Sequence, residues 1–399
     1  MVWAFLAGSR IGWSEDWPQH LGPHRDGVSA EPAPSAWPAA GPPVLWRRSV
    51  GESFAAPVVA GDQVFVFHRI GNQVLLDCLR AADGKAVWTY RATTHYRDDF
   101  GFSEGPRATP VVGKDRVYIF GADGDLTAVD RTSGVRRWSV ATTERFSIAK
   151  GFFGAASSPL VVADRLYLNV GGKDGGLVAF DTADGHVVWA KGSEAASYSS
   201  PVETRFAGRA AILFFTREGI VVAAADDGTL LARYPLRSRS NSSVNAATPL
   251  LLGDRVFASA SYGTGAVLLE TKAGALEPVW ASDDALSNHY ATSVAHQGLL
   301  FGFHGRQEYG PTLRCIDAAT GAVKWSIDRF GAGSILRVSD RLLVLHEDGR
   351  LFLAPASASG FEPIAQARLL EPTVRALPAY ANGVLYAHNE RELIAVRLR

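Results

Sequence analysis

The stretch LTAVDRTSGVRRW, residues 126–138, decides the fold. It recurs as LVAFDTADGHVVW at 177–189 and as LRCIDAATGAVKW at 313–325. Each copy holds an alternating apolar run, an Asp, three residues, a Gly, three residues and a Trp. These fixed positions are filled by Asp130, Gly134 and Trp138, by Asp181, Gly185 and Trp189, and by Asp317, Gly321 and Trp325.

The repeated pattern predicts a β-hairpin. Alternation of apolar and polar residues is typical of a strand with one buried face. The segment from Asp to Gly is typical of a turn, because Gly takes a positive φ at low cost and Asp accepts hydrogen bonds from the nearby backbone. The second strand of the hairpin ends on a Trp. We expect this Trp to be a structural residue that packs between neighbouring units.

Looser copies of the hairpin occur at 79–88, 223–232, 268–280 and 351–364. Where a copy keeps its Trp, the spacing is about 40 to 50 residues, or about twice that across a degenerate copy. A fixed period of this length, with four short strands per unit, is the signature of a β-propeller. The Trp residues of the series are Trp46, Trp88, Trp138, Trp189, Trp280 and Trp325.

Counting the strand that opens each unit predicts an all-β propeller with eight blades of four antiparallel strands. These opening strands follow Pro57, Pro110, Pro159, Pro201 and Pro249, and weaker versions lie at 291–297, 333–339 and 375–381. The last blade ends at 393–399 without a fourth strand, and the orphan strand 44–50 can supply it. Closing the ring in this way removes two free sheet edges that would invite aggregation.

The chain divides into three parts. Residues 44–399 form the predicted propeller, and the Pro- and Gly-rich residues 17–43 are expected to be an extended strap with Trp17 and Trp37 as its anchors. Residues 1–16 hold a short apolar run before small residues. They are interpreted as the remnant of a signal peptide or as a disordered leader, and both readings stay open.

Composition narrows the classes of function. Lys and Arg number 40 and Asp and Glu number 40, so the chain has no net charge, which argues against nucleic acid as a partner. No apolar run in the sequence is long enough to predict a transmembrane segment. Cys78 and Cys315 fall in separate repeats, so we expect two free buried thiols. We expect a monomer.

The two faces of the predicted ring differ in chemistry. One carries short turns, whereas the other carries the blade-to-blade links and the second-to-third turns, which are long and rich in Arg, His, Tyr and Phe. We predict that this loop-rich face binds a protein or a small molecule. Arg and Tyr at the mouth of the central channel would suit a planar or anionic ligand. The predicted mouth residues are Arg107, Tyr198, Asn245, His289, Tyr290 and Arg375, joined by Arg217, His304 and Arg306.

Alternatives exist for these loops. Arg107 and Arg375 could instead pair with loop acids such as Asp99 and Glu371, which would leave a solvated funnel. Asp98, Asp99 and Glu104 could hold calcium, but such a run is more often a solvated loop, and no metal site is predicted. A glycan-active enzyme would need two converging carboxylates from candidates such as Asp99, Glu218 and Glu308. The sequence identifies no catalytic residue.

With its D-x-x-x-G-x-x-x-W hairpins, the repeat resembles the pyrroloquinoline-quinone (PQQ) repeat over about residues 44–399. That family includes the quinoprotein alcohol dehydrogenases and an outer-membrane assembly lipoprotein. The stretches at 16–29 and 105–112 also resemble uncharacterised secreted bacterial members. The resemblance implies an eight-bladed propeller. The enzymes hold PQQ between a Trp and a disulfide of adjacent cysteines, with calcium beside it, and Cys78 and Cys315 are not adjacent.

From these features we expect a periplasmic or secreted protein that binds a partner or ligand without catalysis. A cytoplasmic location stays open. The alternative is a PQQ- and calcium-dependent oxidoreductase of the alcohol or sugar dehydrogenase type.

Overall fold

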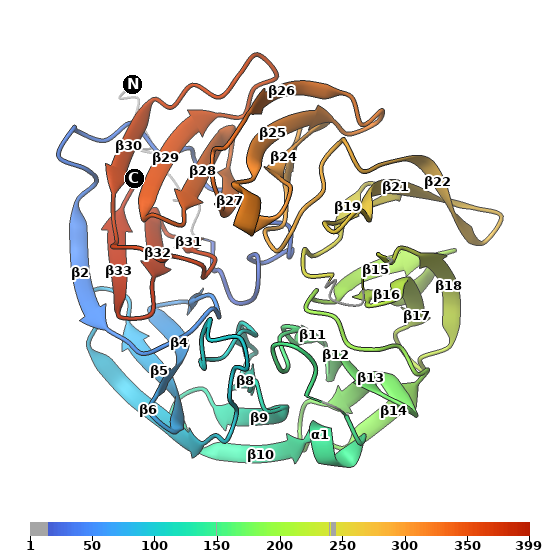
Figure 1. The fold of residues 1–399 in the computed structure, drawn as a ribbon. Coiled ribbons are helices and arrows are strands. Elements are labelled where there is room, and N and C mark those ends of the chain that lie inside the picture. Colours follow the sequence, from blue (N-terminus) through green and yellow to red (C-terminus); the bar gives the residue numbers. More distant parts are fainter. Residues whose placement is uncertain (1–14, 149, 239, 241–244) are drawn as a thin grey trace, which may run out of the picture.

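The computed structural model describes residues 15–148, 150–238, 240 and 245–399. Eight sheets stand around a common axis, each with four antiparallel strands, and the seventh gains a fifth, parallel strand (Figure 1). The four strands follow sequence order in every sheet but the eighth, whose outermost strand comes from the N-terminal part of the chain. The predicted all-β, eight-bladed propeller is therefore confirmed. The described helices, α1 (Thr142–Arg145) and η1 (Gln307–Tyr309), have four and three residues, too few to cross a bilayer.

The first four blades use sixteen consecutive strands. In each blade the first strand lies nearest the axis and the fourth lies outermost (Figure 1). The strands are β3 (Val58–Ala60), β4 (Gln63–Ile70), β5 (Gln73–Arg80) and β6 (Ala86–Thr93); β7 (Val111–Val112), β8 (Arg116–Phe120), β9 (Asp125–Asp130) and β10 (Arg136–Ala141); β11 (Leu160–Val162), β12 (Arg165–Gly172), β13 (Gly175–Asp181) and β14 (Val187–Lys191); β15 (Val202–Phe206), β16 (Arg209–Thr216), β17 (Gly219–Ala224) and β18 (Leu230–Pro235).

The remaining blades include both ends of the propeller segment. They are β19 (Leu250–Leu252), β20 (Arg255–Ala260), β21 (Gly265–Lys272) and β22 (Ala275–Ser282); β23 (Val294–His296), β24 (Leu299–His304), β25 (Thr312–Asp317) and β26 (Val323–Ile327); β27 (Gly333–Val338), β28 (Arg341–His346), β29 (Arg350–Pro355) and β30 (Ala365–Arg368), joined by β1 (Val28–Ser29); and β31 (Ala379–Ala381), β32 (Val384–His388), β33 (Glu392–Arg397) and β2 (Val44–Ser49).

Burial explains the sequence of each strand. The second and third strands of a blade lie between two neighbouring blades, so both of their faces are covered, and β17 is buried at every position. The fourth strand lies at the rim, and β6 is exposed or half-buried throughout. The chain accordingly places continuous apolar runs in the middle strands and mixed residues in the outer ones.

The ring closes where the two ends of the propeller segment meet. Strand β2 pairs antiparallel with β33, with Trp46 opposite Ala395 and Arg47 opposite Ile394. The predicted completion of the last blade by the strand near residue 44 is therefore confirmed. This pairing covers the backbone hydrogen-bonding groups of β33 that would otherwise form an open edge.

Each seam between Trp-bearing blades has the same construction. The Trp138 ring lies against Gly185 in the hairpin turn of the next blade, and its indole Nε1 donates to the Thr182 carbonyl at 3.1 Å. Gly185 has φ +78°, and a Cβ there would lie 2.7 Å from the Trp138 ring. The repeat Gly is therefore required twice, for its backbone conformation and for the space that the Trp occupies. The same contact recurs at Trp46–Gly84, Trp88–Gly134, Trp189–Gly228 and Trp280–Gly321, while Trp325 donates to the Ser357 carbonyl.

Part of the segment before the propeller lies in the central channel. Trp17 pairs with Val59 of β3, and the Pro18 carbonyl accepts from the Val112 amide of β7. Further on, β1 pairs in parallel with β27. Because first strands line the axis, a segment that contacts several of them lies inside the ring, as its dark blue trace shows (Figure 1). We call residues 17–29 the plug.

Buried polar contacts hold the plug in place. Arg25 is 2% exposed, and its guanidinium donates to the carbonyls of Ser158 at 3.0 Å and Pro159 at 2.8 Å. His20 Nε2 lies 3.2 Å from the Thr248 hydroxyl on another blade. The expected extended strap is wrong for this part, since residues 19–25 form compact turns in which Leu21, Gly22 and Arg25 adopt positive φ.

The plug enters and leaves on the face of the short turns. The Asp16 carboxylate accepts from the Gly61 amide in one first-to-second turn. The Glu31 carboxylate accepts from the amides of Asn382 and Gly383 in another. The channel is therefore occupied from that face, and the loop-rich face is left as the side on which first strands begin.

Candidate functional site

Arg107 lies just before β7 on the loop-rich face. Its side chain is only 9% exposed, and its guanidinium lies 3.4 Å from the Asp98 carboxylate. The guanidinium also lies over the rings of Phe54, Tyr96 and Phe153, at 5.6, 5.3 and 5.8 Å from their centres. Such cation–π packing holds the charge in a fixed position between aromatic faces.

Arg375 lies on the other side of the Phe54 ring, 5.6 Å from its centre, and 5.3 Å from the centre of Phe102. Its Nε donates to Glu347 at 3.2 Å. The same Glu347 oxygen accepts from the Tyr290 hydroxyl at 2.6 Å. Burial, and then Glu347, raise the pKa of Tyr290 well above its usual value, so this hydroxyl stays a donor.

His289 and Arg306 extend this cluster. His289 Nδ1 accepts from the Gln307 amide at 3.3 Å, so the neutral ring carries its proton on Nε2 and faces the Tyr262 hydroxyl at 3.0 Å. Burial lowers the pKa of His289 and favours this neutral form. Arg306 lies 4.3 Å over the Tyr262 ring. Gln307 also donates to Glu347 at 3.1 Å, which joins the two clusters.

Tyr198 and Arg217 lie in the neighbouring loops. The Tyr198 hydroxyl accepts from the Phe153 amide at 2.8 Å, and their rings are 5.7 Å apart. The Arg217 guanidinium lies 5.4 Å over the Phe152 ring. Contacts thus connect seven of the predicted mouth residues through shared neighbours: Arg107, Tyr198, Arg217, His289, Tyr290, Arg306 and Arg375.

Asn245 and His304 are placed differently. The Asn245 side-chain amide donates to the carbonyls of Thr216 at 2.8 Å and Leu236 at 3.3 Å, and Asn245 is 3% exposed. His304 Nδ1 accepts from the Ser287 amide at 3.1 Å. Both side chains hold loops together. Asn245 contacts the connected set only through its backbone, where its carbonyl accepts from the Tyr198 amide at 3.0 Å.

Arg107 and Arg375 do pair with acids, but not with those named from the sequence. Asp98 takes the place of Asp99, and Glu347 takes the place of Glu371. Phe54 and Glu347 were not anticipated, although Glu347 belongs to a second-to-third turn. Glu390 was also missed; burial raises its pKa, and its surroundings include Arg375 and Arg107.

Four aromatic side chains gather above these arginines. Phe100 lies 6.1 Å from Phe152 and 5.1 Å from Phe153, and Phe102 lies 5.9 Å from Phe153, measured between ring centres. They come from the links before β7 and β11. We call Phe100, Phe102, Phe152 and Phe153 the aromatic patch. Phe100 is 53% and Phe102 47% exposed, and Tyr309 on η1 is 75% exposed.

The candidate calcium ligands Asp98, Asp99 and Glu104 each bind other groups of the protein. Asp98 accepts from the amides of Phe102 and Ser103, at 2.7 and 2.9 Å. Asp99 pairs with Lys150 at 2.7 Å, and Glu104 pairs with Arg69 at 3.0 Å. The three carboxylates therefore serve loop structure. The other carboxylates named as glycosidase candidates also pair separately, Glu218 with Arg237 and Glu308 with Arg306.

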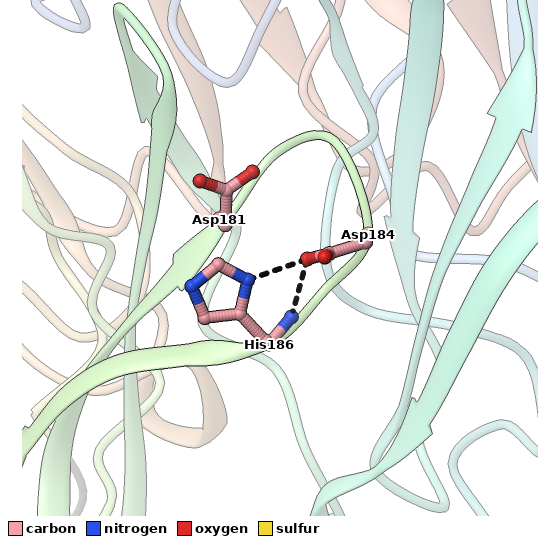
Figure 2. Close-up of side chains that lie close together, drawn as sticks. All are labelled: Asp181, Asp184 and His186. Atoms are coloured by element: carbon pink, nitrogen blue, oxygen red, sulfur yellow. Dashed lines mark hydrogen bonds and ion pairs between the residues drawn. The ribbon is translucent and has the colours of Figure 1, made fainter.

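Among the described residues, ligand atoms of Asp181, Asp184 and His186 lie within 4.8 Å of one another (Figure 2). Asp184 accepts from the His186 amide and lies 2.6 Å from its ring Nδ1. Two other blades carry Ser133 and Thr320 at the position equivalent to Asp184. There the hydroxyl donates to the Asp that begins the same turn, Asp130 or Asp317. This exposed cluster is therefore the recurring turn of the repeat.

A family model described as outer membrane protein assembly factor BamB matches residues 28–167 and 72–327. The matches overlap, and together they span well over half of the chain.

Two relatives match shorter segments. The quinohemoprotein alcohol dehydrogenase ADH-IIG of Pseudomonas putida is 27% identical over 140 residues, which is 34% of this chain and 19% of the relative. The assembly factor BamB of Xanthomonas campestris pv. campestris is 29% identical over 100 residues, 24% of each chain. The matches thus cover less than a quarter of either relative's length.

Solved structures share the fold. BamB of Moraxella catarrhalis superposes with a TM-score of 0.64 at 14% identity, over 88% of this chain and 98% of that one. The quinohemoprotein alcohol dehydrogenase of Comamonas testosteroni gives 0.68 at 14% identity, over 95% and 80%. At this identity the likeness is one of architecture, which binding modules and enzymes share.

Proposed function

Because this chain belongs to the family of the outer membrane protein assembly factor BamB, we propose that it is a binding module that presents its loop-rich face to a protein partner outside the cytoplasm. One observation carries the proposal: Phe100 and Phe102 of the aromatic patch and Tyr309 stand exposed on that face, next to arginines held over aromatic rings. Arg306, for example, lies 5.3 Å from the centre of the Tyr309 ring.

Exposed aromatic rings beside arginines favour a protein interface. Aromatic residues and Arg are enriched in the centres of such interfaces, where they contribute most of the binding energy. Exposed aromatic groups that gather on one face, rather than scatter, mark an interaction site. The arginines are already held by Asp98 and Glu347, so little side-chain entropy would be lost on binding.

The names of the relatives support the kind of partner and the compartment. The family description and one relative refer to the assembly of outer membrane proteins. A protein partner at the cell envelope, and a periplasmic or secreted location, follow by analogy with them. Residues 1–14, which include most of the expected leader, lie outside the described residues.

An oxidoreductase using PQQ and calcium is the alternative raised by the other relatives. The described residues lack one support that this cofactor has in those enzymes. Cys78 in β5 and Cys315 in β25 are buried, free and in different blades, so they cannot form the disulfide shelf of those enzymes. Adding PQQ and calcium to the protein and assaying dye-linked alcohol and sugar oxidation tests this alternative, and turnover above background would replace the binding proposal.

Site-specific photo-crosslinking in the native host tests the binding proposal. We expect a photoreactive phenylalanine analogue at Phe102 or Tyr309 to give a discrete adduct with one envelope protein. Val87 and Val135 are 54% and 58% exposed at the opposite end of their blades, and they serve as matched controls. Adducts of equal yield at the control positions, or none at Phe102 and Tyr309, would contradict the proposal.

A further inference from the structure

A cavity of about 580 Å³ opens on the loop-rich face, on one side of the ring. Its described lining residues all lie between His95 and Arg217, so it belongs to blades 2 to 4 and the links beside them. It is separate from the cluster around Glu347. Its volume falls within the range of pockets that hold small molecules.

The inner walls of the cavity are apolar. Phe120 and Val170 are 2% and 4% exposed, and Ile148 and Phe152 line it nearer the surface. Gly154 packs closely against Tyr96 in one wall, because a Cβ at this position would lie 2.6 Å from the Tyr96 ring. A flat apolar group could therefore lie against these walls.

Two residues that line this cavity, Tyr96 and Ser157, carry buried hydroxyls that lack a partner among the described residues. Tyr96 is 4% exposed and Ser157 is 1% exposed, and neither hydroxyl makes a hydrogen bond to any described residue. Burial raises the pKa of Tyr96 to about 12, so its hydroxyl is a neutral donor at ordinary pH. Buried polar groups are nearly always satisfied, so two free hydroxyls beside one cavity point to an acceptor on a ligand.

Cationic groups surround the opening of the cavity. Its lining includes Lys150, Arg217 and Arg97, against the single carboxylate of Asp123, and Arg97 lies 3.6 Å from the Glu104 carboxylate. Lys150 lies 5.4 Å over the Tyr96 ring and pairs with Asp99, which itself does not line the cavity. The Asp123 carboxylate already accepts from the Thr94 hydroxyl at 2.8 Å. The balance of charge at the opening therefore favours an anion.

We propose that this cavity binds a small organic anion with a flat apolar body. The body lies against Phe120 and Val170, a ligand oxygen accepts from the Tyr96 and Ser157 hydroxyls, and the anionic group lies toward Lys150 and Arg217. Phe152 of the aromatic patch lines this cavity, but the contacts proposed for the ligand involve neither Tyr309 nor Phe102, so this site goes beyond the proposed protein interface and does not depend on it.

Calorimetric titration of the full chain with 2-naphthoate, and with the neutral 2-naphthamide, tests the site. We expect 2-naphthoate to bind with a dissociation constant of about 0.1 mM or tighter, and the amide to bind at least about tenfold more weakly. Ala196→Trp at the exposed rim should abolish binding by filling the cavity. Ala183→Trp, on an exposed turn of the opposite face, is its matched control and should bind normally.

The hydroxyls give a second readout that separates binding from folding. Tyr96→Phe and Ser157→Ala should each weaken 2-naphthoate about fivefold or more, and neither should lower the unfolding midpoint, because no internal hydrogen bond is lost. Tyr167→Phe is the matched control: its hydroxyl donates to the Ala225 carbonyl at 3.0 Å, so this variant should lose stability and keep its affinity. Arg217→Ala should weaken 2-naphthoate about tenfold, whereas Arg209→Ala should not.

The proposal is overturned if 2-naphthoate does not bind at about 5 mM, or if the amide binds equally well. It is also overturned if Ala196→Trp or Tyr96→Phe leaves the affinity unchanged. None of these results would alter the expected crosslinks at Phe102 and Tyr309, so the two proposals fail separately.

Discussion

Substituting the repeat glycine by alanine tests the construction of the blade seams. Gly185 and Gly274 occupy hairpin turns of blades 3 and 5 with nearly the same backbone, φ +78° and +81°. A Cβ at Gly185 would lie 2.7 Å from the Trp138 ring, whereas a Cβ at Gly274 would meet nothing within 4 Å. The blade before Gly274 carries Ala232 where others carry Trp. The pair therefore separates the cost of the backbone from the cost of the seam.

The expected losses in the free energy of unfolding combine a backbone cost and a packing cost. A left-handed conformation costs a non-glycine residue about 1–2 kcal/mol, and both variants carry this cost. Overpacking against a fixed ring adds about 1–3 kcal/mol at Gly185 alone. We expect Gly274→Ala to lower the free energy of unfolding by about 1–2 kcal/mol, and Gly185→Ala to lower it by about 2–5 kcal/mol.

Urea unfolding followed by far-ultraviolet circular dichroism measures both losses. In a Trp138→Ala background the ring is gone, so the further cost of Gly185→Ala should fall to that of Gly274→Ala. Equal losses for the two single variants would refute the seam contact. So would a double variant whose losses simply add.

Three further predictions concern the ring and its plug. Trp189 is 6% exposed, so Trp189→Ala should lower the free energy of unfolding by about 3–5 kcal/mol in the same assay, and a loss below about 1 kcal/mol would count against seam packing. A chain that starts at residue 52 loses both the plug and β2, so light scattering should show association through the open edge of β33; a stable monomer would contradict the closure. Burial lowers the pKa of His20 to about 3, so the folded state holds it neutral, and stability falls as pH drops from about 6.5 toward 3. Between pH 7 and pH 5 this loss is at most about 2 kcal/mol by urea unfolding, and His20→Gln should remove it; an unchanged pH dependence would exclude His20 as its source.

The blades were predictable because the repeat is local. Each hairpin turn is specified by its own Asp and Gly, and strand alternation needs no knowledge of distant residues. The Asp130 carboxylate, for instance, accepts from the amides of Thr132 and Ser133 within the same turn. Counting opening strands then predicted the number of blades and the closure by residues 44–50.

The plug was not predictable in the same way. Residues 17–29 have no periodicity, and their position depends on a channel that exists only when the ring is closed. Arg25, for example, binds carbonyls at Ser158 and Pro159, which lie more than a hundred residues away. A lone Arg in a Pro- and Gly-rich segment gives no signal of such a partner.

The sequence predicted which residues lie near the channel mouth, but not which groups their side chains bind. Arg375 was placed at the mouth because it precedes β31, yet its acid is Glu347 from the turn of the neighbouring blade. Tyr198 and Asn245 both precede first strands, but the Asn245 amide turns back to the Thr216 carbonyl. Side-chain direction in these loops depends on contacts between blades, which the order of residues does not specify.

Amide hydrogen exchange of the full chain, with and without the partner captured by crosslinking, tests the central claim most directly. The account predicts slower exchange in the loops that carry the aromatic patch and η1, at 98–107, 150–157 and 305–310. It predicts unchanged exchange in the hairpin turns of the opposite face, such as 130–135 and 181–186. Protection of those turns with no change in the three loops would contradict the claim that the loop-rich face is the binding surface.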